Sequence, residues 1–236
     1  MLGLPNPTPL DLRFSLFGVP VWVSAWHWLG AGYFGWQLAE AFGPGNLGGV
    51  TLATHLAMGM LCVFLSILLH EMGHAMAAHW FGMNRAILMT MLGGLAYGPL
   101  RPGTKWWQLV LIALAGPFVQ FLFAAILFGG MLAASVANGG PVGGSPLAVT
   151  LFQSLLLVNI VWPLFNLLPI VPLDGGHVLQ YTLGRFMGRR GDVWAGRLGL
   201  LLAIGFAALF LVMRQTYMTV LFGFLAVQNY QMMRSS

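Results

Sequence analysis

The feature that most constrains the fold is a series of apolar runs, each about 20 residues long, that fill most of the chain. A run of this length crosses the hydrocarbon core of a bilayer as one α-helix. Only 6% of the residues are charged, whereas a soluble domain carries about 25%. The sequence therefore predicts an all-α polytopic membrane protein with about six transmembrane helices. We expect these spans at residues 22–42, 54–82, 107–136, 148–171, 196–213 and 216–233.

Segments rich in basic residues alternate with segments that carry few or no charged residues between the predicted spans. The basic residues gather in the 83–106 and 180–197 segments, while the 137–147 loop carries no charge. The positive-inside rule then places the two basic segments and both termini in the cytoplasm. The net charge of +5 follows from this distribution, so we expect no nucleic-acid partner.

Two segments do not fit a helical pattern. Residues 12–23 are rich in β-formers and partly alternate, and residues 86–98 hold two short apolar arms around Gly93-Gly94. The first predicts an N-terminal strand and the second a hairpin or a re-entrant loop. We therefore expect a small membrane-associated β-sheet beside the helices.

Ionisable residues interrupt the second apolar run at His70-Glu71-Met72-Gly73-His74. An acid at mid-membrane costs roughly 2.5–3.5 kcal/mol on insertion scales, which indicates a functional role. Histidines four residues apart lie on one face of a helix and can bind one metal ion. A glutamate beside them is placed to act as general base and acid. A catalytic zinc site then needs a third protein ligand.

Elimination points to Asp174 as the third ligand. Asp11 precedes every predicted span, Glu40 ends the first span on the external side, and Asp192 lies among arginines. Asp174 alone has apolar surroundings, near the cytoplasmic end of the fourth predicted span. His70 and His74 fall in the cytoplasmic half of the second span, so the two segments can meet at similar depth.

The segment before Asp174 is predicted to break its helix. Pro169 and Pro172 remove backbone donors, and Gly175-Gly176 permits close approach of backbone. The freed backbone groups, together with the Asn166 amide, would suit an extended peptide.

With these motifs the chain resembles the site-2 protease family of intramembrane zinc metalloproteases. Residues 70–75 resemble its zinc helix, and residues 166–175 its Asn-x-x-Pro…Leu-Asp-Gly segment. Ala115-Gly116-Pro117 resembles the motif on its middle core helix, and Gly93-Gly94 falls where the family has a glycine-rich loop. Gln120 departs from the pattern, because Asn is expected there.

The resemblance implies one zinc ion bound by His70, His74 and Asp174, with Glu71 as general base and acid. It also implies substrate contact through Asn166, Pro169 and the edge of the 86–98 hairpin, including Gly93 and Gly94, by β-strand addition. The substrates would be transmembrane segments of membrane-bound regulatory proteins, usually cleaved first by another protease.

The same resemblance implies one integral membrane metalloprotease domain over residues 1–236. Its core helices would span about 54–82, 107–136 and 148–180, and the helices near 22–42, 196–213 and 216–233 would be peripheral. We expect a compact form without a PDZ or CBS domain. A bacterial or archaeal plasma membrane is the expected location, with the active site toward the cytoplasm.

A second reading is a metal-binding membrane protein without proteolysis, either a transporter or a catalytically silent homologue. A transport site has no need for Glu71 beside the ligands, and a silent homologue would be free to lose it. The intact motif therefore favours a catalytic role over transport or a silent homologue.

Overall fold

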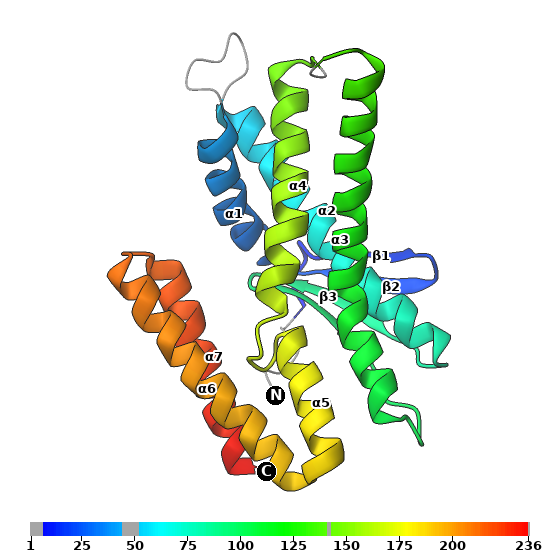
Figure 1. Cartoon of the computed structure of the whole chain (residues 1–236), viewed down its shortest axis with the longest axis vertical. Coiled ribbons are helices and arrows are strands. Elements are labelled where there is room, and N and C mark those ends of the chain that lie inside the picture. The colour runs from blue at the N-terminus through cyan, green and yellow to red at the C-terminus, as the bar shows by residue number, and fades with distance from the viewer. Residues whose placement is uncertain (1–6, 44–51, 141–142, 236) are drawn as a thin grey trace. The chain divides into compact units, whose positions relative to one another are not determined.

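The structure is a computed structural model that describes residues 7–43, 52–140 and 143–235 (Figure 1). Within these ranges the chain forms seven helices and a small four-stranded sheet, which confirms the predicted fold class. The strands are β1 (Leu12–Leu16), β2 (Val19–Val23), β3 (Ala86–Thr90) and β4 (Gly93–Tyr97). The helices are α1 (His27–Phe42), α2 (Leu52–Trp80), α3 (Trp106–Ala137), α4 (Pro146–Asn166), α5 (Asp174–Met187), α6 (Arg189–Val212) and α7 (Thr216–Ser235).

Four of the described helices, α2, α3, α4 and α6, are long and apolar enough to cross a membrane. Helices α1 and α7 cover most of the remaining two predicted spans. The predicted start of the first span at residue 22 was wrong, since Trp22 and Val23 pair in β2 with Leu88 and Met89 of β3.

Two further boundaries differ from the prediction. The fourth span was expected to reach residue 171, but α4 ends at Asn166, before the prolines, and α5 begins at Asp174. The basic segment 180–197 was expected as a loop, but it is helical on both sides of Gly188. The positive φ of this glycine, 57°, ends α5 and lets α6 start at the next residue.

The chain divides into two compact units. The first comprises Met1–Leu100 and Phe118–Pro163, and the second Arg101–Pro117 and Leu164–Ser236, within the described ranges.

The sheet belongs to the first unit and has the strand order β1-β2-β3-β4. The N-terminal segment forms an antiparallel hairpin of two strands where one strand was expected. Its second strand pairs in parallel with β3, and β3 pairs antiparallel with β4. The turn of the second hairpin is Met91-Leu92, so the two glycines begin β4 rather than forming the turn.

The core of the first unit joins one face of the sheet to α1 and α2. Val21 and Val23 of β2 and Ile87 and Met89 of β3 are buried against apolar residues of both helices, among them Met72. The hydrophobic contact holds the sheet on the helix that carries the histidines.

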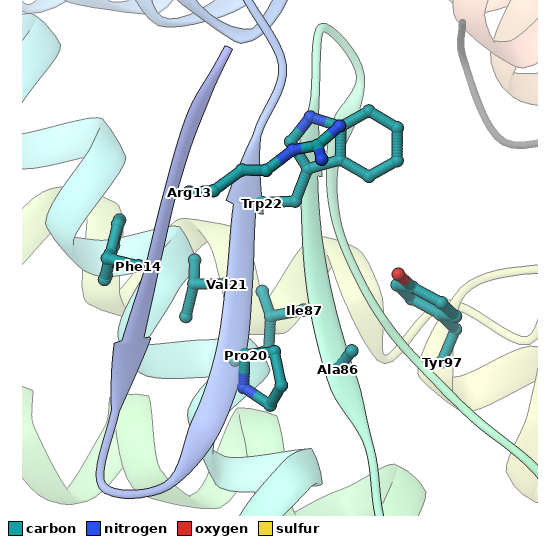
Figure 2. Close-up of a pocket in the computed structure, with 8 residues that line it drawn as sticks. All are labelled: Arg13, Phe14, Pro20, Val21, Trp22, Ala86, Ile87 and Tyr97. Atoms are coloured by element: carbon teal, nitrogen blue, oxygen red, sulfur yellow. The ribbon is translucent and has the colours of Figure 1, made fainter. Parts of the chain in front are cut away.

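A cavity of about 250 Å³ lies at the sheet and is lined by residues of all four strands (Figure 2). Figure 2 shows the Arg13 guanidinium stacked over the Trp22 ring, 4.7 Å from its centroid. None of the three residues singled out in the 70–74 motif lines this cavity.

Asp11 anchors the start of the first hairpin. Its carboxylate accepts hydrogen bonds from the Thr8 hydroxyl and amide, the Ala25 amide and the Trp22 indole, at 2.6–2.9 Å. These bonds, led by that of the Thr8 hydroxyl, hold the pKa of Asp11 well below its usual range. The stabilisation is complete above the unfolded pKa of about 3.9 and is lost only as pH falls through the lowered value.

In the second unit α6 and α7 lie side by side (Figure 1). Their contact is a stack of apolar side chains around Phe222 and Ala203. Ile170, from the segment between α4 and α5, is fully buried in the same cluster. This packing fixes the chain just before Asp174.

Candidate metal centre

Helix α2 positions both histidines and the glutamate of the 70–74 motif. It is unbroken from Leu52 to Trp80, so the four-residue spacing puts the two imidazoles one turn apart. His70, Glu71 and His74 are only 2%, 5% and 8% exposed. The motif is therefore buried.

The two imidazoles direct their Nε2 atoms toward each other. The Nε2 atoms of His70 and His74 are 3.0 Å apart, and the rings are nearly perpendicular, with centroids 4.7 Å apart. Two ring nitrogens bound to one tetrahedral zinc ion at about 2.05 Å lie about 3.3 Å from each other. The pair thus has nearly the spacing that a shared ion requires.

The other ring nitrogen of His70 is also engaged. Its Nδ1 lies 2.8 Å from Oε1 of Gln120 on α3. Metal-binding histidines generally donate their second N–H to an oxygen in this way. In the sequence, Gln120 was only a departure from the family pattern, and no role was predicted for it.

Glu71 is covered by the first residues of β4. A Cβ built on Gly94 would overlap the Glu71 side chain and lie 2.6 Å from its Oε1. A Cβ on Gly93, whose φ is 135°, would lie 3.1 Å from the Trp162 ring. The predicted substrate contact of these two glycines stays a prediction. Their described neighbours are Glu71 and Trp162. Only glycine at 94 lets the strand lie directly on the glutamate.

Asp174 is the first residue of α5, in the second unit. A helix N-terminus stabilises a negative charge, which suits a carboxylate ligand. The next two residues must be small, because a Cβ on Gly175 would meet the Leu167 carbonyl and one on Gly176 the Ile170 backbone. The predicted helix break is present, with Asn166 and Pro169 both half-buried at its start.

A second residue missed by the sequence prediction, Asn229 of α7, fixes this break. Its amide donates to the Val171 carbonyl at 2.6 Å and accepts from the Val171 amide at 3.3 Å. Asn229 is fully buried. These two bonds satisfy the backbone N–H and C=O of Val171, which lies between α4 and α5 and outside both helices.

His70 and His74 of the first unit and Asp174 of the second carry donor groups of the kinds that can bind one metal ion. Two imidazole nitrogens and one carboxylate oxygen are the donor types of catalytic zinc sites, which keep a fourth position open. The residues thus fit zinc. The competing acid Asp11 is already engaged by Thr8, Trp22 and Ala25.

Comparison with known proteins agrees with this donor set. Residues 135–212, which include the helix break and Asp174, match Peptidase family M50. A Synechocystis sp. protein named "Putative zinc metalloprotease" is 31% identical over 228 residues, covering 91% of this chain and 57% of the relative. The chain is thus similar to zinc metalloproteases of peptidase family M50.

A sequence relative and a solved structure, both from Methanocaldococcus jannaschii, extend the comparison. A zinc metalloprotease is 34% identical over 133 residues, covering 56% of this chain and 36% of that protein. The solved structure of a site-2 protease has a TM-score of 0.61 and 24% identity, and covers 94% of this chain and 95% of that one. The chain thus has the fold of this site-2 protease. It spans about half the length of the curated relatives it matches.

Proposed function

We propose that this protein is a zinc-dependent endopeptidase that cleaves transmembrane segments within the membrane. The observation that carries the proposal is the buried His70–His74 pair with converging Nε2 atoms and Glu71 beside it. The similarity to peptidase family M50 and to zinc metalloproteases adds the expectation of zinc metalloprotease chemistry. We assign His70, His74 and Asp174 as the zinc ligands.

When bound, zinc supplies Lewis-acid chemistry that polarises a peptide carbonyl and makes water a better nucleophile near neutral pH. Glu71 does the proton work. Its carboxylate takes a proton from the attacking water and passes it to the amine nitrogen that leaves as the peptide bond breaks. Burial of Glu71 keeps bulk water from competing for that proton.

An extended substrate would bind along two features. One is β4, which lies at the end of the strand order and pairs with β3 among the described strands. The other is the non-helical segment from Asn166 to Asp174, with Pro169 inside it. Strand addition needs an extended peptide, so a helical substrate must unwind locally before cleavage. Helix-weakening residues near the scissile bond should therefore favour cleavage.

The substrates we propose are membrane-bound regulatory proteins that another protease has already shortened. The basic residues of segments 83–106 and 180–197 support a site that faces the cytoplasm. The relatives from Synechocystis sp. and Methanocaldococcus jannaschii support a bacterial or archaeal plasma membrane. No partner other than the substrate and the bilayer is required by this account.

The test is cleavage of a membrane-spanning reporter by the purified protein in liposomes. We expect cleavage that stops when a chelator removes the metal and returns when zinc is added. Equal cleavage with and without chelator would reject the mechanism. Metal flux across the same liposomes without any cleavage would instead support the transporter alternative.

Adding a methyl group at Gly94 should impair catalysis without removing the metal. Gly94→Ala forces Glu71 or β4 to shift, and misplacement by about 1 Å can cost about 10²-fold in rate. The reporter assay and zinc analysis, run on the same preparation, measure the two effects separately. Gly129→Ala on α3 is the matched control, because a Cβ there meets no atom within 4 Å. Full activity of Gly94→Ala would show that Glu71 tolerates displacement.

A further inference from the structure

A network of two buried amides and one buried hydroxyl leads away from His70 within the first unit. Gln120 of α3, Asn159 of α4 and Ser66 of α2 are 0%, 0% and 1% exposed. Their three helices are all candidate membrane spans. Polar side chains are expensive in such helices, so a connected set of them indicates a task.

The donor and acceptor roles in this hydrogen-bond network are fixed. Asn159 Nδ2 lies 2.9 Å from the Leu155 carbonyl oxygen, and Gln120 Nε2 lies 3.1 Å from the Ser66 carbonyl oxygen. A backbone carbonyl can only accept, so both of these amide atoms must be the N–H₂ donors. The remaining contacts agree, since Asn159 donates to Ser66 Oγ at 2.8 Å and accepts from Gln120 at 3.3 Å.

These roles decide the protonation of His70. With its nitrogen committed to Ser66, Gln120 presents Oε1, an acceptor, to His70 Nδ1 at 2.8 Å. Nδ1 must therefore carry the proton. In the neutral ring the free electron pair then lies on Nε2, which is the atom 3.0 Å from Nε2 of His74.

We propose that Gln120 is a positioning residue that sets the tautomer and orientation of His70 for zinc. Asn159 and Ser66 hold the Gln120 amide in the one orientation that does this. The proposal rests on the metal site of the proposed function, but it concerns zinc affinity and does not depend on cleavage. Gln120 touches neither metal nor substrate and acts only through His70.

Two substitutions of similar length separate positioning from packing. Gln120→Met removes the acceptor for His70 Nδ1–H, and we expect zinc affinity to fall about 10–100-fold. Gln120→Glu keeps an oxygen toward Nδ1 but cannot donate to the Ser66 carbonyl, so we expect near wild-type affinity. If Gln120 only filled space, the carboxylate would harm the site at least as much as methionine. The readout is competition for zinc with a chromophoric chelator, using purified, metal-stripped protein in detergent.

Substitutions on α4 give an independent arm. Asn159→Ala removes one acceptor of Gln120 and the donor to Ser66 Oγ, so a smaller loss of zinc affinity is expected. Ser154→Ala, equally buried on the same helix but outside the network, should leave affinity unchanged. Thermal unfolding of each metal-free protein reports whether it is folded.

Wild-type zinc affinity in Gln120→Met, or an equal loss in Gln120→Glu, would overturn the proposal. If Gln120→Met does not fold, equal affinities of Asn159→Ala and Ser154→Ala would overturn it instead. The expected affinity pattern in a chain that cleaves no reporter would reject the protease and leave this inference standing.

Discussion

Replacing Glu71 by glutamine is expected to lower reporter cleavage by about 10²–10⁴-fold, the usual contribution of a general acid–base residue. Glutamine keeps the size of the side chain beneath Gly94 but can neither take a proton from water nor pass one to the leaving amine. Zinc content should stay at the wild-type level, because Glu71 is not among the proposed ligands. Single-turnover cleavage in liposomes, with metal analysis of the same sample, measures both quantities.

The control for this substitution is Glu40→Gln, because Glu40 is the other glutamate of the chain. It is exposed on α1 and should leave cleavage unchanged. Undiminished cleavage by Glu71→Gln would mean that another group carries out the proton transfer. Loss of zinc together with activity would instead make Glu71 part of the metal site.

Replacing His74 by alanine is expected to remove both zinc and cleavage. Catalytic zinc sites use three protein ligands, and the two imidazoles of α2 supply two of them in this account. The change also leaves Nε2 of His70 without the atom that lies 3.0 Å away. We therefore expect zinc to fall from about one ion per chain to trace amounts, with no cleavage above background.

His79→Ala is the matched control for His74→Ala. His79 lies on the same helix, near its end, and is exposed. Its loss should change neither zinc content nor cleavage. A His74→Ala protein that still carries a full equivalent of zinc would contradict the assignment of α2 as the zinc helix.

Local patterns predicted much of this molecule. The helix carrying His70 and His74, the break before Asp174 and the 86–98 hairpin each follow from neighbouring residues, through spacing, proline and apolar runs. The first hairpin was only half predicted, because its second strand depends on pairing with β3, more than 60 residues further along. That pairing also explains why α1 begins later than the apolar run does.

Local patterns could not predict the residues that orient the site. Gln120 lies 50 residues from His70, and Asn229 lies 58 residues from Val171. Single polar residues in apolar helices were the available signal, and it does not say which backbone or ring each one meets. Gly94 was recognised as one of a glycine pair, but its contact with Glu71 required the fold.

We propose that one zinc ion is held by two imidazoles of α2 and the carboxylate at the start of α5. Metal analysis of purified Asp174→Ala, beside Asp192→Ala as a control acid in the first turn of α6, tests it most directly. We expect about one zinc ion per chain in the control and only traces in Asp174→Ala. A full equivalent of zinc in Asp174→Ala, bound as tightly as in the wild type, would contradict it.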